Sequence, residues 1–351
     1  MKKVVLFYVE LSHYRLPILD RLAKHCDLTI VYSKGALPDR NYSFKTVQVP
    51  LVEIGPFFLF KIKGFFCFLK SFDVVIGLMD LRLLQFMLLC FIKKKYKLAL
   101  WGIGVSGSYT KKFNAENTPS KLRTYIASHA DALIFYSSVP VEKFLAKKFN
   151  PQKMYIAHNT IDNIVPMNLV SKRDIILFVG TLYKAKGVED LIESYFHAYR
   201  INPLDLPKLV IVGGGELFQD LKSYVVDIGL ENNIELTGPI YDGDKLKAYF
   251  ERAIFAVSPQ QAGLSVLTSM SYGVPFVTCK DANTGGEILN IINGFNGYLL
   301  DSTDDFVELF SEASSKLEVF KAMGVQAFDY YREKRSPDVM AGALIKCIED
   351  F

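Results

Sequence analysis

Short apolar runs of strand length alternate with longer amphipathic stretches along almost the whole chain. In the first half, residues 4–9 and 74–78 are apolar runs, and residues 14–24 and the stretch near 81–94 have helical periodicity. The second half repeats the scheme, with apolar runs at 175–179 and 208–212 and a helical stretch between them at 187–199. This alternation predicts parallel strands joined by crossover helices. We therefore expect an α/β fold with two Rossmann-like, doubly wound domains that face a cleft.

The length of 351 residues also favours two domains, because single cores rarely grow that large. We expect an N-terminal domain at 1–165, a second domain at 166–335, and a C-terminal helix at 336–351 that can pack back on the first domain. Residues 159–172 are the best linker candidate. Open α/β sheets bind ligands beyond the carboxyl ends of their strands, so the shared cleft is the expected site.

The two halves of the chain carry opposite charge. Residues 1–165 contain 24 Lys and Arg against 11 Asp and Glu, which gives +13, and residues 166–351 contain 17 against 26, which gives −9. The lysines at 57–70 are interleaved with phenylalanines, a mixture that favours a lipid interface over nucleic acid. A buried helix with two solvent-facing lysines explains the same run equally well.

Cysteine usage and hydropathy indicate a cytoplasmic protein. The five cysteines are scattered, which argues against a disulfide framework and against a metal cluster. We find no apolar run of the roughly 18 residues that a membrane-spanning helix needs. The apolar N-terminus is soon followed by Glu10, His13 and Arg15, so we expect a buried first strand there and no signal peptide.

Three loops in the second half follow predicted strands and precede predicted helices. The first, residues 180–187, holds two lysines, and the second, residues 213–216, holds three glycines. The third, residues 258–265, has a glycine where a helix begins. Helix starts and nearby lysines can hold a diphosphate, and glycines let the backbone approach it. Each loop alone is also typical of an ordinary βα turn, and the two lysines of the first loop also fit solvated loop charges.

In this order and spacing, the three loops resemble the donor-binding half of the retaining GT-B glycosyltransferases of family 4, also called group 1. The resemblance extends to 233–240, to 258–270 with Gly273-Val274-Pro275, and to 294–299. Upstream, residues 13–17 and 130–137 are also similar to the family. The ordered set is what carries the resemblance.

The resemblance implies roles for particular residues. Lys186 would contact the donor diphosphate, and Gly263, Leu264 and Ser265 would receive its distal phosphate at the helix start. Oriented amides and a lysine stabilise the charge that develops on a leaving diphosphate, so no metal is expected. The remaining donor-side residues are Gly180, Thr181, Gly214, Gly238, Ile240, Gln260, Thr268 and Glu287, with Gly238 to Ile240 along the nucleobase.

Four positions depart from the family pattern. Two glutamates eight positions apart are common in the family, and Gln260 and Thr268 stand there instead. Thr181 replaces a second cation of the first loop, and Ile103, before Gly104, replaces a histidine near the reacting sugar. Glutamine can still hydrogen-bond to hydroxyls, and threonine can do so only at shorter reach.

Glu287 is a candidate replacement for the missing ribose carboxylate. It follows Thr284 by three residues, before an apolar stretch, which is also the pattern of a helix capping box. Both interpretations remain open, and they are compatible.

The acceptor side is expected in the basic half. His13 and Arg15 follow the first strand, where acceptor or leaving-group contacts would lie, and Ile103 and Gly104 follow a later strand. A local hydrogen-bonding role is the more common one for a lone histidine at such a place. Residues 106–121 form a polar loop whose lysines face either a pyrophosphate-linked acceptor or water.

We therefore expect a glycosyltransferase that moves a hexosyl or N-acetylhexosaminyl group from a nucleotide-diphosphate sugar to a glycan acceptor. A lipid-linked, polyprenyl acceptor at the inner face of the plasma membrane fits the basic, Phe-rich half. Two alternatives are a non-catalytic binding partner with the same fold, favoured by the four departures, and a nucleotide-sugar 2-epimerase. The five histidines all lie outside the second-half loops, which weakens the epimerase.

Overall fold

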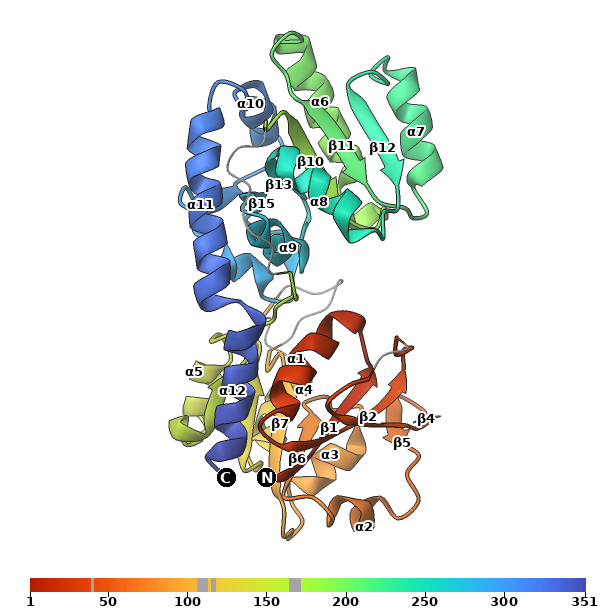
Figure 1. Cartoon of the computed structure of the whole chain (residues 1–351), viewed down its shortest axis with the longest axis vertical. Coiled ribbons are helices and arrows are strands. Elements are labelled where there is room, and N and C mark those ends of the chain that lie inside the picture. Colours follow the sequence, from red (N-terminus) through yellow and green to blue (C-terminus); the bar gives the residue numbers. More distant parts are fainter. Residues whose placement is uncertain (39–40, 106–112, 115–117, 164–171) are drawn as a thin grey trace. The chain divides into compact units, whose positions relative to one another are not determined.

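The computed structural model describes residues 1–38, 41–105, 113–114, 118–163 and 172–351 (Figure 1). Within these described ranges, the residues up to 162 and those from 335 onward form unit 1, and the residues from 163 to 334 form unit 2. Much of the expected linker at 159–172 and of the expected polar loop at 106–121 lies outside the described residues. No helix within the described ranges is both long and apolar enough to span a bilayer.

Unit 1 is built on a parallel sheet of seven strands. Its strands, in the order β3-β2-β1-β6-β7-β8-β9, are Lys45–Gln48, Asp27–Lys34, Lys3–Glu10, Val74–Leu78, Lys97–Gly102, Ala132–Phe135 and Met154–Ile156. An antiparallel hairpin joins β4, Leu51–Ile54, to β5, Phe57–Phe60. The helices are α1 Leu16–Ala23, α2 Phe65–Leu69, α3 Leu84–Leu89, α4 Thr118–Ala127, α5 Val141–Leu145 and α12 Pro337–Glu349.

The alternating side chains of β1 divide the core of unit 1 into two layers. Leu6 and Tyr8 pack with residues of α1 and α12, which lie side by side in Figure 1. Phe7 points to the opposite layer, where its ring centroid lies 5.3 Å from that of Phe60 and 5.0 Å from that of Phe86. Successive strand residues face opposite sides, so this sheet is buried on both faces, as its apolar runs predict.

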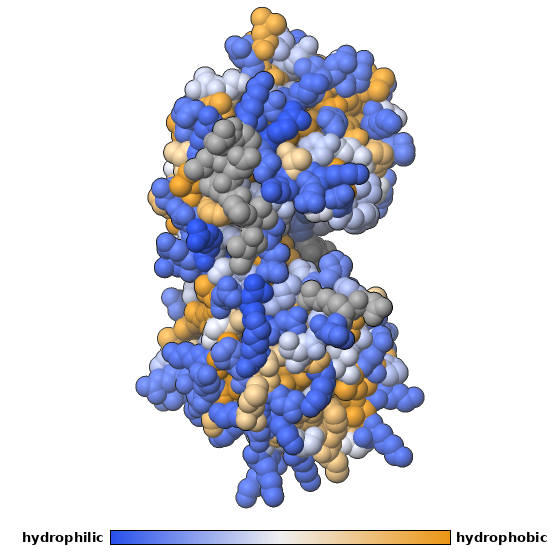
Figure 2. Space-filling model, viewed as in Figure 1, coloured by the Kyte–Doolittle hydropathy of each residue, from blue (hydrophilic) through white to orange (hydrophobic). Residues whose placement is uncertain are grey.

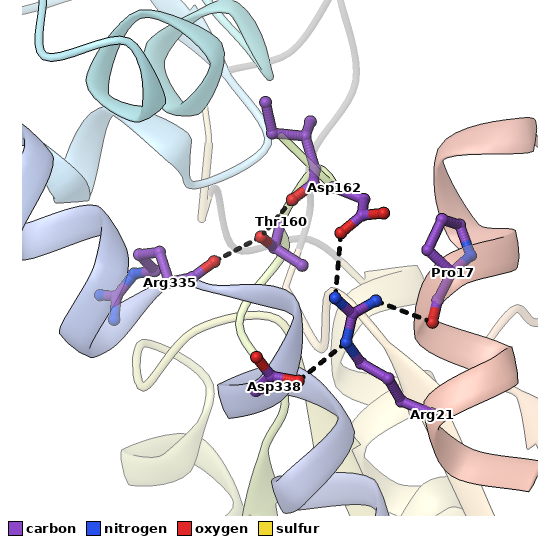
Figure 3. A network of polar contacts seen from close by, with 7 residues as sticks. Pro17, Arg21, Thr160, Asp162, Arg335 and Asp338 are labelled. Atoms are coloured by element: carbon purple, nitrogen blue, oxygen red, sulfur yellow. Dashed lines mark hydrogen bonds and ion pairs between the residues drawn. The ribbon is translucent and has the colours of Figure 1, made fainter. Parts of the chain in front are cut away.

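A network of polar contacts holds the two segments where the chain leaves and re-enters unit 1 (Figure 3). The guanidinium of Arg21, on α1, lies 3.2 Å from the carboxylate of Asp162 and 2.8 Å from that of Asp338. The hydroxyl of Thr160 donates a hydrogen bond to the carbonyl of Arg335. The outgoing segment and the first turn of α12 are thereby fixed to α1 and to each other.

Unit 2 has a parallel sheet of six strands. In the order β12-β11-β10-β13-β15-β17 these are Ile234–Gly238, Lys208–Val212, Ile175–Val179, Ala253–Val257, Phe276–Cys279 and Gly297–Leu300. A second pair joins β14, Gln261–Ala262, to β16, Asn283–Thr284. The helices are α6 Val188–Ile201, α7 Phe218–Asp227, α8 Gly243–Arg252, α9 Ser265–Ser271, α10 Asp305–Ser311 and α11 Leu317–Lys334. The expected alternation of strands and helices is confirmed.

Two local expectations need correction. The helix expected near residues 81–94 is shorter, because the Asp80 carboxylate accepts a hydrogen bond from the Arg82 amide and turns the chain before Leu84. The Phe-rich run at 57–70 is not one helix: it forms β5, a turn through Gly64 at φ 64°, and α2. Phe65 in α2 is buried, whereas Phe66 is 48% exposed.

Candidate functional site

The first two candidate loops of unit 2 are hydrogen-bonded to each other at the carboxyl ends of their strands. The amide of Gly180 donates to the carbonyl of Val212 at 3.0 Å, and the amide of Leu182 donates to that of Gly214 at 2.9 Å. The amide of Gly213 donates at 3.0 Å to Gly238, at the end of β12. The ends of β10, β11 and β12 are therefore joined into one surface.

Close backbone approach explains the run of glycines in the second loop. A Cβ on Gly213 would lie 1.8 Å from the carbonyl oxygen of Gly180, and one on Gly215 would lie 2.3 Å from that of Leu182. A Cβ on Gly214 would lie 3.3 Å from Pro239, which precedes Ile240. No side chain fits at the outer two positions without moving the backbone of the first loop.

Lys186 is the distinctive side chain of these loops. It ends a short 3-10 helix, Lys184–Lys186, and its ammonium lies beside the backbone of Gly180, where a Cβ would be 3.4 Å from Nζ. Nζ also lies 5.9 Å from the ring centroid of Tyr183. Burial lowers the pKa of Lys186 from 10.5 to about 8, and within the described ranges no carboxylate forms an ion pair with it. Neighbouring Lys184 is exposed.

A half-buried ammonium without a counter-charge is costly in a folded protein. Such groups are retained at sites where an anionic ligand supplies the missing charge. The environment of Lys186 therefore fits an anion-binding role, and the exposed Lys184 fits a solvated loop charge.

The third loop is held against the first by two side-chain contacts. Tyr183 donates a hydrogen bond of 2.6 Å to Oε1 of Gln261. Gln260 lies over Gly187 and donates to the carboxylate of Asp190 in the first turn of α6. The structure thus brings Lys186 and the third loop onto the same side of the sheet of unit 2.

Two buried hydroxyl groups in the third loop have no hydrogen-bond partner among the described residues. They are Oγ of Ser258, which is 2% exposed, and Oγ of Ser265, the first residue of α9. The amides at the start of α9, after Gly263 and Leu264, have no acceptor within the helix. Both kinds of donor are suited to a phosphate oxygen.

The two threonines that replace family residues lie differently. Thr268 bonds its hydroxyl back to the carbonyl of Leu264 at 3.1 Å, within its own helix. Thr181 is exposed at the end of β10. Neither supplies a charge to the loops around Lys186.

The expected capping box at Glu287 was only partly correct. The helix that follows is a 3-10 helix of four residues, Glu287–Asn290. Its start is capped by Thr284, whose Oγ1 accepts from the amides of Gly286 and Ile288, at 3.0 and 3.2 Å. Glu287 accepts from the amide of Gly285 at 3.0 Å. In a standard capping box Thr284 would be the N-cap, but here the N-cap is Gly286, two residues later.

The candidate acceptor-side residues lie in unit 1, at the carboxyl end of its sheet. His13 is exposed, and Arg15, two residues on, is 6% exposed. Ile103 is partly buried. Gly104, at φ 73°, allows no side chain, because a Cβ would lie 2.7 Å from both Phe135 and Pro140.

The sequence of unit 2 matches a known family. Residues 173–317 match the family model of glycosyl transferases group 1. The chain is 25% identical over 177 residues to the poly(glycerol-phosphate) alpha-glucosyltransferase of Bacillus subtilis strain 168, and 34% identical over 134 residues to an uncharacterized glycosyltransferase of Methanocaldococcus jannaschii. The matches cover 49% and 35% of this chain, but only 25% and 31% of the length of those two relatives.

The fold is shared over the full length with a solved structure. Anabaena HepE in complex with UDP covers 100% of this chain and of its own, with a TM-score of 0.71 at 13% identity. This chain therefore has the GT-B fold.

Residues 173–317 are thus similar to the group 1 glycosyl transferases. In this matched region, Lys186, the glycine loops and the third loop lie at the carboxyl ends of the strands of unit 2. The part of the chain that the structure describes contains no group of three or more His, Cys, Asp or Glu side chains able to hold a metal ion.

Four residues of the domain join the candidate site without having been predicted from the sequence. Tyr183 and Gln261 link the first loop to the third, Asp190 binds Gln260, and Ser258 presents an unpartnered hydroxyl. Their positions between predicted site residues were the only signal available, because the pairings cross 70 or more residues of sequence.

Proposed function

We propose that this glycosyltransferase moves a sugar from a nucleotide-diphosphate sugar to a glycan acceptor, with retention of the anomeric configuration. The observation that carries the proposal is Lys186, a half-buried ammonium without a carboxylate partner among the described residues. It lies in the first of the three loops, all of which belong to the matched residues 173–317. A diphosphate is the anion that a group 1 domain would receive there.

The proposed chemistry uses the charge of the leaving group. The bond between C1 of the sugar and the distal phosphate oxygen breaks, and a bond forms on the same face between C1 and the acceptor oxygen. The proton of the acceptor hydroxyl passes to the leaving phosphate. Protonated Lys186, the amides of Gly263, Leu264 and Ser265, and the Ser265 hydroxyl would stabilise the negative charge that develops. No metal is required in this scheme.

The remaining donor contacts follow from the same placement. Gly180 and Gly214 allow backbone approach, and Gly238 to Ile240 would lie along the base. Gln260 uses its Nε2 on Asp190, so its Oε1 can accept from a sugar hydroxyl. Glu287 would hold the ribose. HepE was solved with UDP, which makes UDP-sugars the first donors to test.

The acceptor is proposed to be a glycan or polyprenyl-linked glycan at a membrane surface. Phe66, Leu88 and Phe91 of unit 1 are 48%, 56% and 54% exposed, and Lys63 and Lys93 nearby in sequence are exposed. Figure 2 shows hydrophobic residues among hydrophilic ones on the face of unit 1 in view. Exposed aromatic residues beside lysines suit the interface of an anionic bilayer. A cytoplasmic protein in peripheral contact with the inner membrane fits this surface.

The test is donor binding and turnover with a matched pair of lysine variants. Thermal stabilisation by UDP-, GDP-, ADP- and dTDP-sugars is measured for the wild type, Lys186→Met and Lys184→Met, because a ligand of the folded state raises the melting temperature. We expect one nucleotide class to stabilise the wild type and Lys184→Met but not Lys186→Met.

Release of the nucleotide with an acceptor then separates an enzyme from a non-catalytic binding partner. Binding without any turnover would favour the partner. Absence of stabilisation by every donor would refute the proposal.

A further inference from the structure

A buried arginine without an acidic partner lies at the carboxyl end of the sheet of unit 1. Arg15 is 6% exposed, and the ring centroids of Tyr14, Tyr136 and Trp101 lie 5.1, 5.2 and 5.7 Å from its guanidinium carbon. No Asp or Glu of the described ranges forms an ion pair with it. Aromatic faces stabilise a guanidinium, but they carry no net charge to neutralise it.

The hydrogen bonds of Arg15 are also incomplete. Nη2 donates to Oδ1 of Asn159 at 2.8 Å, and Nη1 donates to the sulfur of Met340, a weak acceptor, at 3.2 Å. A guanidinium has five N–H donors. Tyr14 is a further side-chain hydrogen-bond partner, so part of the donor capacity of this buried cation is unused by protein oxygens.

Two further buried donors beside Arg15 have no partner in the described part of the chain. They are the hydroxyl of Tyr8, which is 7% exposed, and the indole N–H of Trp101, which is 2% exposed. The two rings lie 6.1 Å apart. Burial raises the pKa of Tyr8 far above its ordinary value of 10.0, so its hydroxyl keeps its proton and can donate.

We infer that Arg15, Tyr8 and Trp101 form a binding site for an oxyanion, a carboxylate or phosphoryl group. An indole N–H and a guanidinium can only donate, so the group that satisfies them must be an acceptor. Buried donors without acceptors are rare in native proteins, and each calls for a missing water or ion. A water would satisfy the hydrogen bonds, but only an anion also neutralises Arg15.

Tyr14, Tyr136 and Asn159, which contact Arg15, are only partly buried, so the cluster lies near the surface of unit 1. The residues all belong to unit 1, and none of them belongs to the donor loops of unit 2.

Trp101 makes the test direct, because it is the only tryptophan in the chain. Its fluorescence is followed while the whole protein is titrated with sodium phosphate or sodium acetate, against sodium chloride at equal ionic strength. We expect a saturable change with phosphate, acetate or both, and the anion that acts tells a phosphoryl site from a carboxylate site. No change beyond that of chloride with either anion would overturn the inference.

Tyr8→Phe is the informative variant. Loss of a hydrogen bond to a charged group should weaken anion binding about tenfold or more. The apo protein should not lose stability, because the hydroxyl that is removed has no partner. Equal anion affinity in Tyr8→Phe and the wild type would overturn the inference.

Two controls isolate the site. Tyr155→Phe removes a hydroxyl that donates to Asp350 at 2.7 Å in the same unit, so it should lower the melting temperature and leave anion affinity unchanged. Lys186→Met should keep the Trp101 response. If the Trp101 response disappeared in Lys186→Met, the anion would bind in unit 2, and the inference would be overturned.

Discussion

Replacement of Lys186 by methionine should make the protein more stable and should abolish donor binding. Methionine keeps the apolar stem of the side chain and removes the half-buried ammonium. A lysine that serves only the fold would show the opposite effect on stability. The two effects together distinguish a ligand-binding lysine from a structural one.

The size of the stabilisation follows from the pKa. Burial lowers the pKa of Lys186 from 10.5 to about 8, and each pH unit corresponds to about 1.4 kcal/mol. The difference between the two values gives an upper bound of roughly 3 to 4 kcal/mol. Water reaches part of the ammonium, so we expect a gain of about 1 to 2 kcal/mol in the free energy of unfolding at pH 7.

The pH dependence of this gain has a definite direction. Below pH 8 both the folded and the unfolded wild type carry the charge, and the full cost of burying it is present. Between about pH 8 and 10.5 the unfolded chain binds more protons than the folded protein, so the wild type gains stability as the pH rises. The advantage of Lys186→Met should therefore shrink above pH 8.

Donor binding in the wild type should weaken over the same range. The free protein loses the Lys186 proton above about pH 8, and affinity for a diphosphate should fall by up to about tenfold for each further pH unit.

Urea unfolding at pH 7 and at pH 9.5, with calorimetric titration of the nucleotide sugar, measures these effects. Lys184→Met is the control: that lysine is exposed, so we expect changes within about 0.5 kcal/mol and unchanged donor affinity. A Lys186→Met protein that is less stable than the wild type at pH 7, and that binds donor equally well, would refute the reasoning.

Three other substitutions test the packing and the contacts around these elements. Gly213→Ala should cost about 3 kcal/mol or more in urea unfolding, because its Cβ would overlap the Gly180 carbonyl, whereas Gly243→Ala, in open space at the start of α8, should cost nothing. Glu287→Ala removes the acceptor of the Gly285 amide and should lower the free energy of unfolding by about 1 kcal/mol. If Glu287 also contacts the ribose, the variant should bind the donor about tenfold more weakly in calorimetry. Unchanged donor affinity would mean that Glu287 only holds the Gly285 amide. Arg21→Met, which breaks two partly exposed ion pairs, should cost at most about 1 kcal/mol in thermal unfolding, less at high salt, and a larger loss would contradict the surface character of this network.

The strands of both sheets were predictable because their signal is local. The runs at 74–78, 175–179 and 208–212 have the bounds of β6, β10 and β11. Each is an almost unbroken apolar run, which is the sequence pattern of a strand that is buried on both faces of a sheet. The helix near residues 81–94 was less well predicted, because the Asp80 turn that delays its start leaves no mark in hydrophobic periodicity.

The candidate site was predictable where backbone geometry dictates the residue type. Gly213 is a glycine because another loop passes 1.8 Å from the place of its Cβ, and such a run of glycines is visible in the sequence. The partners Tyr183–Gln261 and Gln260–Asp190 were not predictable. They depend on how two loops, each ordinary by itself, lie against each other in space.

Arg173 shows how a buried cation with a structural role differs from Lys186. It is 6% exposed, and its two Nη atoms donate to the carbonyls of Ala253 and Gly273, at 2.8 and 2.9 Å. These acceptors belong to the segments that begin β13 and precede β15, so the guanidinium joins two connections of the sheet of unit 2. Arg173→Met would leave both carbonyls without these donors, at about 1 to 3 kcal/mol each.

The same replacement should therefore have opposite effects at the two sites. In urea unfolding, Arg173→Met should lower the free energy of unfolding by about 2 kcal/mol or more, with donor affinity unchanged in the protein that remains folded. Lys186→Met should raise it. If both variants were destabilised to a similar degree, the lack of a carboxylate partner would not distinguish a ligand-binding cation from a structural one. The inference that Lys186 binds an anion would then be refuted.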